Sequence, residues 1–177
     1  MGKVRIPNKV LLMTAVCCNS ENMEQIAVEK LTGLFGPVED RTSPFNFSHT
    51  HYYQEEMGND LTKFYLTFTH LIDPSQIADI KLATNTIEDE LSLSGSRNVN
   101  LDPGYIEVPK LVLATTKNFS HRVYINKGIY GDVQLYWQAG TFHANPWTYP
   151  DYVVPANLAF FNQQRQRYFK RIQEENL

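Results

Sequence analysis

The densest group of polar residues that could do chemistry lies between positions 98 and 122. Lys110, Lys117 and Arg122 could bind a phosphate or carboxylate group through charge-assisted hydrogen bonds. His121 could transfer a proton near neutral pH, which makes it the candidate catalytic residue. The alternative is that the lysines are solvated and that His121 makes one hydrogen bond at the start of a strand. The same stretch supplies further candidate ligand-binding residues, which are Asn98, Asn100, Asp102, Thr115 and Thr116.

A second group of polar residues has the spacing of one side of a helix. Lys81, Asn85 and Glu88 follow an i, i+4, i+7 pattern beside an apolar stripe, so they lie in one row. Such a row can reach into a cleft between a helix and a sheet, and all three are candidate ligand-binding residues. The alternative is a solvated surface ladder that contributes about 0.2–0.5 kcal/mol per pair.

A proline-rich aromatic loop carries the last candidate. Residues 145–155 contain three prolines, so this segment cannot form a regular helix or strand. Asp151 lies among its aromatic residues and could accept a hydrogen bond from Arg122 or from a ligand. The rings could stack on a ligand, or they could close the end of a sheet.

The sequence predicts no metal site and assigns no cofactor. His49 and His51 would share one face of a strand, but the nearby carboxylates have no fixed spacing of metal ligands. The glycine patterns that bind nucleotides are absent, as are the zinc-protease motif and the nucleophile elbow. The chemistry therefore has to be inferred from the groups described above.

Composition indicates one ordinary globular domain over residues 1–177. The net charge of −3 makes a bulk electrostatic nucleic-acid binder an unfavoured class. The two cysteines, Cys17 and Cys18, are adjacent, which is no framework for disulfides. The apolar run that contains them is too short to span a bilayer, and no signal-peptide cleavage site follows. We therefore expect a cytoplasmic protein without a membrane segment.

Hydrophobic periodicity and turn residues predict the elements. Residues 105–117 are ambiguous: Pro109 could start a short helix, which we favour, or the run could be a buried strand. The other expected elements are strands at 9–16, 51–57, 63–69, 97–101, 121–125, 129–137 and 141–143, helices at 20–35, 73–91 and 155–173, and turns at 58–60, 102–104, 126–128 and 138–140.

This order predicts an α+β fold with a mostly antiparallel sheet. The first part has the order of a ferredoxin-like βαββαβ unit, which a β-meander and a C-terminal helix follow. We find no internal repeat, no low-complexity tract and no linker in the sequence.

The chain resembles an uncharacterised bacterial family of about this length, which is filed as a domain of unknown function. The resemblance implies family membership and supplies no catalytic residues. Some members of this family are labelled GTP-binding, but this sequence has no P-loop to support that label. The matching stretches are SPFNFSHTHYYQEEMG (43–58), KLATNTIEDEL (81–91), NVNLDPGYIEVPKLVLATTKNFSHRVYINKGIYGDVQL (98–135) and NPWTYPDY (145–152).

Two functional hypotheses of different classes follow. In the first, the protein binds or transforms a small anionic ligand, phosphorylated or nucleotide-like, and the candidate residues converge in one pocket. In the second, it is a non-catalytic module for a protein or RNA partner, which predicts an exposed apolar patch or a basic stripe along the last helix. We favour the first hypothesis, because burying so many polar groups costs free energy unless they are paired or used.

Overall fold

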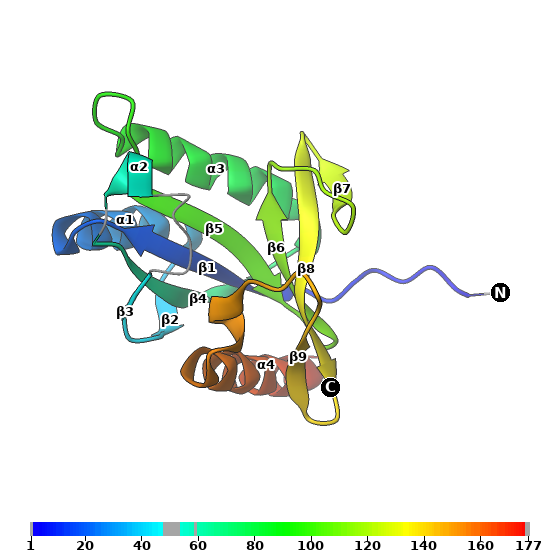
Figure 1. Ribbon diagram of the computed structural model, residues 1–177. Helices are drawn as coiled ribbons and strands as arrows, with labels where there is room; N and C mark the ends of the chain where they lie inside the picture. The colour runs from blue at the N-terminus through cyan, green and yellow to red at the C-terminus, as the bar shows by residue number, and fades with distance from the viewer. Residues whose placement is uncertain (1, 48–53, 59, 176–177) are drawn as a thin grey trace.

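The computed structural model describes residues 2–47, 54–58 and 60–175, which form an α+β fold around one mostly antiparallel sheet (Figure 1). Residues 2–9 are exposed and run away from the body of the molecule. In chain order the elements are β1 (Val10–Cys18), α1 (Glu21–Phe35), β2 (Val38–Arg41), β3 (Phe45–Asn46), α2 (Gln54–Met57), β4 (Thr62–Ile72), the 3-10 helix η1 (Pro74–Gln76), α3 (Ile77–Glu90), β5 (Val99–Ile106), β6 (Lys110–Thr115), β7 (Val123–Asn126), β8 (Ile129–Gln138), β9 (Thr141–Ala144), the 3-10 helix η2 (Pro150–Val153) and α4 (Pro155–Glu175).

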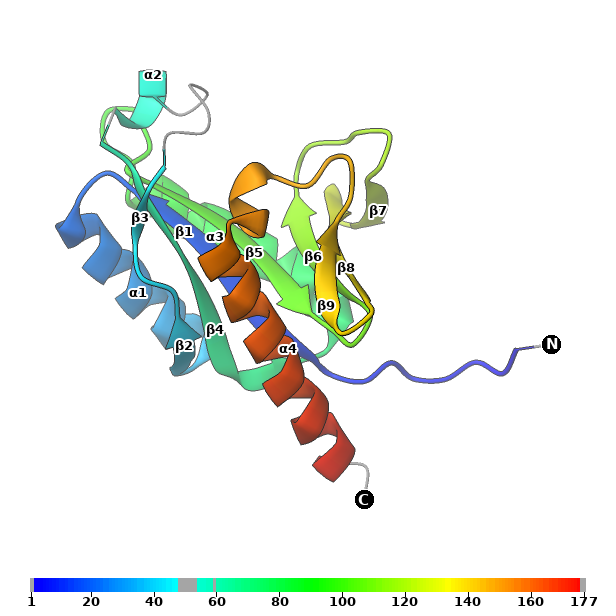
Figure 2. The same cartoon turned by 60° about the horizontal axis from the view of Figure 1, so that its bottom comes forward.

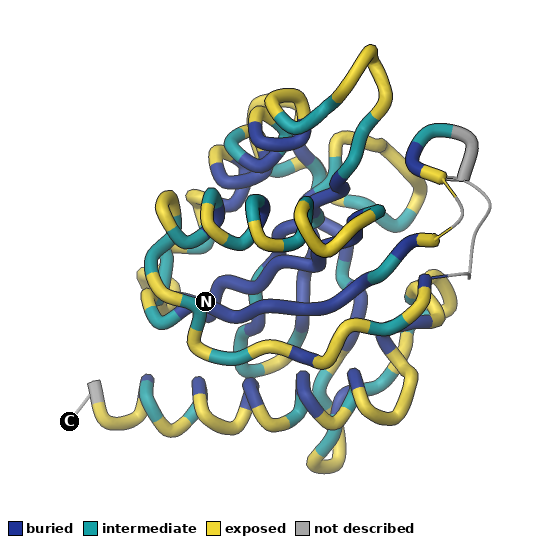
Figure 3. The backbone as a smooth tube through the Cα atoms, turned by 90° about the vertical axis from the view of Figure 1, so that its left-hand side faces the viewer, coloured by how far each residue is buried: buried dark blue, intermediate teal, exposed yellow. Residues whose placement is uncertain are grey.

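Helices cover both faces of the sheet. The helices α1 and α3 pack on one face and α4 crosses the other (Figure 2). Successive residues of a strand point to opposite faces, so Leu12 and Val16 of β1 join the cluster under α1 and α3, whereas Leu11 and Met13 join the cluster under α4. All nine residues of β1 are therefore buried, and Figure 3 shows the same burial along the central strands.

Local capping signals place the ends of the helices where the sequence predicts them. Ser20 caps α1 by accepting a hydrogen bond from the Met23 amide. Asp73 and Gln76 form a capping box at η1, directly before α3 and at the start of the helix predicted from residue 73. The predicted C-terminal helix is α4, and no helix in the described part of the chain is long and apolar enough to cross a membrane.

The strand order is β2-β4-β1-β5-β6-β8-β7, with β3 paired to β4 and β9 paired to β8. Every pair is antiparallel. The predicted βαββαβ order is present as β1, α1, β2, β4, α3 and β5, with β3 and α2 inserted before β4. Its second strand is β2, in a segment where no strand was predicted, and not the strand predicted at 51–57. The predicted meander is also present as the successive hairpins β7–β8 and β8–β9, and β6 pairs with β8 as well.

The strand predicted at 51–57 is wrong over residues 54–57, which form the short helix α2, and residues 51–53 lie outside the described part of the chain. Gln, Glu and Met are good helix formers without a branch at Cβ. Met57 packs against Phe47 and Leu61 in a small cluster beside the sheet. The burial of Met57 therefore does not require the alternating pattern of a strand.

The turn predicted at 102–104 and the favoured helix at 105–117 are both wrong. β5 continues through Pro103 and Gly104 to Ile106, and β6 is the buried strand that was the alternative. Leu101 directs its N–H and C=O away from β1, and alternation places the missing N–H of Pro103 on the same edge. No ladder bond to β1 is lost there, so proline is tolerated.

β5 and β6 pair over a short stretch only. Gly104 to Ile106 face Leu111 to Leu113, and the earlier part of β5 has no strand on that edge among the described residues. At the branch point a Cβ on Gly104 would lie 2.3 Å from the carbonyl oxygen of Val112. The glycine therefore allows the backbones to approach before the two strands diverge.

We predict that Gly104→Ala lowers the free energy of unfolding by about 1–3 kcal/mol, because the added methyl overlaps the β6 backbone. Gly33→Ala is the matched control, since Gly33 lies in α1 with no atom within 4 Å of an added Cβ, and it should gain about 0.5–1 kcal/mol. Urea denaturation of both variants measures the difference. Equal stability of the two would contradict the close approach.

Candidate ligand-binding site

A pocket of about 720 Å³ opens where β5 and β6 diverge. This volume is in the range of small-molecule sites. Its walls come from β1, β4, α3, β5, β6, β8 and the loop around η2. The lining residues are Cys17, Phe47, Lys63, Lys81, Asn85, Glu88, Asp89, Arg97, Asn100, Asp102, Leu113, Ala114, Thr115, Thr116, Lys117, Asp132, Tyr149, Pro150, Asp151 and Tyr152.

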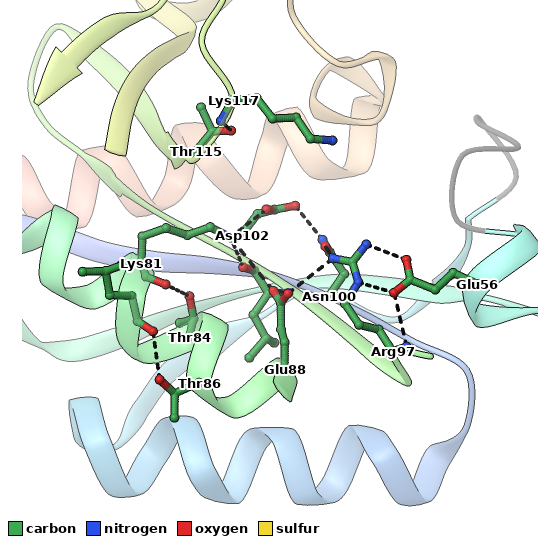
Figure 4. Close-up of polar contacts among 12 residues, drawn as sticks. Glu56, Lys81, Thr84, Thr86, Glu88, Arg97, Asn100, Asp102, Thr115 and Lys117 are labelled. Carbon is green, nitrogen blue, oxygen red and sulfur yellow. Dashed lines mark hydrogen bonds and ion pairs between the residues drawn. The ribbon is translucent and has the colours of Figure 1, made fainter. Parts of the chain in front are cut away.

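Side chains of α3 occupy the edge of β5 that β6 leaves open. The amide of Leu101 donates to Glu88 Oε1 at 2.6 Å, and Lys81 Nζ donates to the carbonyl oxygen of Leu101 at 2.7 Å (Figure 4). Buried backbone groups need such partners. The two side chains therefore make the hydrogen bonds to the Leu101 backbone that a neighbouring strand would otherwise make. Because no strand is needed there, this side of the pocket stays open.

Lys81 also organises the polar floor of the pocket. Its ammonium lies 3.3 Å from Asp102 Oδ1, and Asn100 donates to Asp102 Oδ2 at 2.8 Å. Burial raises the pKa of Asp102, but Lys81, Lys63 and the bond from Asn100 outweigh burial and hold the pKa below its usual value. Asp102 is therefore an ionised acceptor at the pocket surface.

Arg97 closes the end of the pocket next to α2. It binds both carboxylate oxygens of Glu56, at 2.8 and 2.7 Å, and lies 3.3 Å from Glu88 Oε2. It also donates to Asn100 Oδ1 at 3.0 Å. Hydrogen bonding to Arg97 lowers the pKa of Glu56, whereas burial raises the pKa of Glu88. The guanidinium thus joins α2, α3 and β5 around the pocket.

The opposite wall is formed by the end of β6 and by β8. Thr115 and Lys117 lie across the pocket from Lys81 and Asp102 in Figure 4, and Lys117 is exposed. Asp132 is buried in β8 and accepts a hydrogen bond from Arg122 Nε at 2.8 Å. This wall therefore combines an exposed cation and threonine hydroxyls with a buried carboxylate.

A buried ion pair lies at the inner end of the pocket. Lys63 Nζ is 2.7 Å from Asp151 Oδ2, and both side chains are almost completely buried. Tyr65 donates its hydroxyl to the same carboxylate oxygen. The Lys63 ammonium also lies over the ring of Phe47, 4.7 Å from its centroid, which is a favourable cation–π distance.

Most of the candidates from the sequence converge in this pocket, although they come from four separate parts of the chain. The candidates that line it are Lys81, Asn85, Glu88, Asn100, Asp102, Lys117 and Asp151, together with Thr115 and Thr116. The ladder alternative for Lys81 and Glu88 is wrong, because both side chains are buried. Asn98 lies outside the lining and bonds to Asn19 and to the Leu91 carbonyl.

Lys110, His121 and Arg122 are not lining residues. Lys110 forms an ion pair with Glu107 beyond the pocket. His121 stacks on Trp147, with centroids 4.8 Å apart, and its Nε2 lies 3.4 Å from Asp132 Oδ2. His121 therefore contacts the lining at Asp132. Arg122 supports the lining from outside, because it donates to Asp132, to the carbonyl oxygen of Lys117 and to the hydroxyl of Tyr149.

Five lining residues with a charged or thiol side chain were not among the candidates from the sequence: Cys17, Lys63, Asp89, Arg97 and Asp132. The burial of Lys63 could have been inferred from the sequence. Lys63 and Phe64 are neighbours in a strand, so they point to opposite faces of the sheet, and Lys63 is exposed only if nothing covers its face. The amphipathic α4 covers that face, so Lys63 had to be buried. Arg97 meets Glu56 across 41 positions, and no local pattern could predict that contact.

The lining favours binding through charge and hydrogen bonds over nucleophilic attack by a thiol. Burial raises the pKa of Cys17 to about 12, so its thiolate is scarce at neutral pH. The described residues contain no group of three histidine, cysteine or carboxylate side chains placed to hold a metal, and the predicted pair His49 and His51 lies outside them. The pocket can offer several donors and acceptors to one polar ligand.

We predict that both cysteines of the native protein resist a chromogenic disulfide reagent at about pH 8. With a pKa of about 12, roughly one Cys17 thiol in ten thousand is ionised at that pH. The absorbance should report no thiol in buffer and both thiols in denaturant. Rapid modification of one thiol in buffer would show that the pocket lowers the pKa of Cys17.

We also predict a stability effect of Glu88 that depends on pH. Burial raises the pKa of Glu88 above its usual 4.5, so folding favours the protonated carboxyl. Its contribution to stability is complete below about pH 4.5 and is lost as the pH rises through the raised pKa. The free energy of unfolding of the wild type, minus that of Glu88→Gln, should therefore fall between about pH 4 and pH 8 in urea titrations. A difference that grows with pH would show that the ion pairs outweigh burial.

Comparison with protein families places most of the chain in one group. The family model described as a domain of unknown function, DUF4416, matches residues 8–168. No curated protein and no solved structure matches the chain.

Proposed function

The chain belongs to the DUF4416 family, and we propose that it binds a small phosphorylated molecule that carries hydroxyl groups. The observation that supports this proposal most strongly is the convergence of polar residues from α3, β5, β6 and the η2 loop on one pocket of about 720 Å³. A nucleotide or a sugar phosphate has the size and the mixture of groups that such a pocket takes.

The anionic group of the ligand is assigned to the wall formed by the end of β6. The lysines of the interior, Lys63 and Lys81, already contact carboxylates, so an additional anion gains little from them. Lys117 is exposed at the pocket, with the hydroxyls of Thr115 and Thr116 beside it. Ammonium and hydroxyl donors together suit a phosphate.

The hydroxyl groups of the ligand are assigned to the floor of the pocket. The lining holds four basic side chains, Lys63, Lys81, Arg97 and Lys117, and five acidic ones, Glu88, Asp89, Asp102, Asp132 and Asp151. This balance suits a ligand that brings hydrogen-bond donors as well as negative charge. Asp102 is ionised, and Lys81 and Asn100 contact one carboxylate oxygen each. A carboxylate oxygen can accept more than one hydrogen bond, so Asp102 can also accept from a hydroxyl.

Two finer expectations belong to the proposal. Some members of the family are labelled GTP-binding, so GTP is one probe, although the phosphate would bind here without a P-loop. Both cysteines are free, which suits a reducing compartment, and we expect the protein to act in the cytoplasm. His121 can transfer a proton only through Asp132 in this arrangement, so we propose binding and assign no reaction.

One observation favours the second candidate function, an interaction module. Phe119, Val123 and Tyr124 are exposed by 65, 72 and 58 % at β7 and the loop before it. Exposed apolar side chains that gather in one region mark surfaces for partners. A protein that binds no member of a small-molecule panel would point to this surface instead.

We predict that Lys117→Ala weakens binding of a phosphorylated ligand by about 10-fold or more, because a hydrogen bond to a charged group contributes about 1.5–3 kcal/mol. The first measurement is the melting temperature with nucleotides, GTP among them, and with sugar phosphates. Titration calorimetry on the best probe then compares Lys117→Ala with the control Lys110→Ala. Lys110 is similarly cationic but lies outside the pocket, so its loss should have little effect. Equal loss in both variants would contradict the assigned site.

A further inference from the structure

The inner end of the pocket contains a hydroxyl that has no partner. Tyr152 is completely buried and lines the pocket, and its phenol oxygen makes no hydrogen bond among the described residues. Burial raises the pKa of Tyr152 well above its usual value, so the group remains a neutral O–H donor. An unsatisfied buried hydroxyl costs free energy that phenylalanine would avoid.

A second unused donor lies beside it. The ammonium of Lys63 has three N–H groups, and Asp151 is its one polar contact in the described part of the chain. Its remaining surroundings are aromatic: Nζ lies 5.6 Å from the centroid of Tyr65 and 5.8 Å from that of Tyr152. Lys63 and Tyr152 therefore bring two donors to the same end of the pocket.

We propose that this inner end is a subsite for an uncharged carbonyl oxygen of the ligand, which accepts hydrogen bonds from Tyr152 Oη and Lys63 Nζ. A carbonyl oxygen is an acceptor with two lone pairs, so it can serve both donors. The proposal deepens the proposed function, since it names the group that the phosphorylated ligand carries at the end away from Lys117.

An uncharged acceptor fits this end of the pocket better than a carboxylate. Asp151 already neutralises Lys63 at 2.7 Å, and Asp102 lies close enough for Lys63 to lower its pKa. A further negative charge would meet two carboxylates in a buried environment, where repulsion is strong. The rings of Phe47, Tyr65 and Tyr152 give the subsite apolar walls, which suit the planar carbon skeleton of an amide or a nucleobase.

The subsite is tested with two matched pairs of probes that differ at one carbonyl group. Inosine 5′-monophosphate is compared with adenosine 5′-monophosphate, and N-acetylglucosamine 6-phosphate with glucose 6-phosphate. By calorimetry, the carbonyl member of at least one pair should bind the wild type about 3- to 10-fold more tightly, as the neutral hydrogen bond from Tyr152 alone allows. Tyr152→Phe should remove that preference without lowering the melting temperature.

Thr14→Val is the matched control. Thr14 also carries a buried hydroxyl without a partner among the residues that the structure describes, and it does not line the pocket. This variant should keep both the melting temperature and the preference for the carbonyl probe. Binding of both members of each pair with equal affinity would overturn the subsite and leave the proposed function standing.

A probe without phosphate separates the two proposals. Crystals of the full chain are soaked with N-methylacetamide, whose carbonyl should lie within hydrogen-bond distance of Tyr152 Oη and Lys63 Nζ in the wild type and should be absent in Tyr152→Phe. If none of the phosphorylated probes binds, the proposed function fails, and the soak still decides the subsite. An empty inner pocket, or an amide bound identically in Tyr152→Phe, overturns it.

Discussion

The divergence of β5 from β6 is the constraint on which the rest of the site depends. The strands are joined at Gly104, where only a hydrogen fits against the carbonyl oxygen of Val112, and they separate directly afterwards. An open strand edge inside a protein is costly unless its backbone groups find partners. Lys81 and Glu88 supply those partners at Leu101, so the gap stays open as a pocket and does not close as continuous sheet.

The hydrogen bonds of Lys81 and Glu88 place charged side chains in the interior, and these side chains need partners of opposite charge. Lys81 bonds to a backbone carbonyl and to Asp102, and Arg97 bonds to both Glu56 and Glu88. Buried charges are tolerated only when they are paired and hydrogen-bonded. The network is thus needed for the fold of this region, and the same network gives the pocket its polar floor. The same side chains therefore stabilise the fold and line the pocket.

Sequence reasoning predicted what depends on short-range signals. The predicted helix starts at residues 20 and 73 and the predicted turn at 126–128 between β7 and β8 are all present, because a few neighbouring residues determine them. It failed at Pro103 and Gly104, where turn residues serve a strand with one free edge. Whether that edge of β5 pairs with another strand depends on the positions of β6 and α3 in space. A short stretch of sequence around Pro103 cannot reveal those positions.

The site also combines residues that local sequence patterns reveal with residues that only distant contacts place there. The row on α3 and the polar stretch of β5 and β6 could be found by composition and spacing, and they meet in the pocket. Arg97 could not be found in this way, because it depends on a contact 41 positions away. Lys63 could be found only by expecting α4 to bury its face of the sheet. His121 was found for its chemistry, but its ring stacks on Trp147 outside the lining.

The distribution of charge along the pocket gives a ligand a direction. At the wall of β6 the exposed Lys117 can attract an anion from solvent. In physiological salt an exposed charge attracts ions of opposite sign over about 8 Å, the Debye length. At the inner end the ammonium of Lys63 is neutralised by Asp151 and surrounded by rings, so it retains its donors but little net attraction for charge. A phosphorylated molecule would therefore enter with its uncharged end first, because that end loses the least hydration in the buried part.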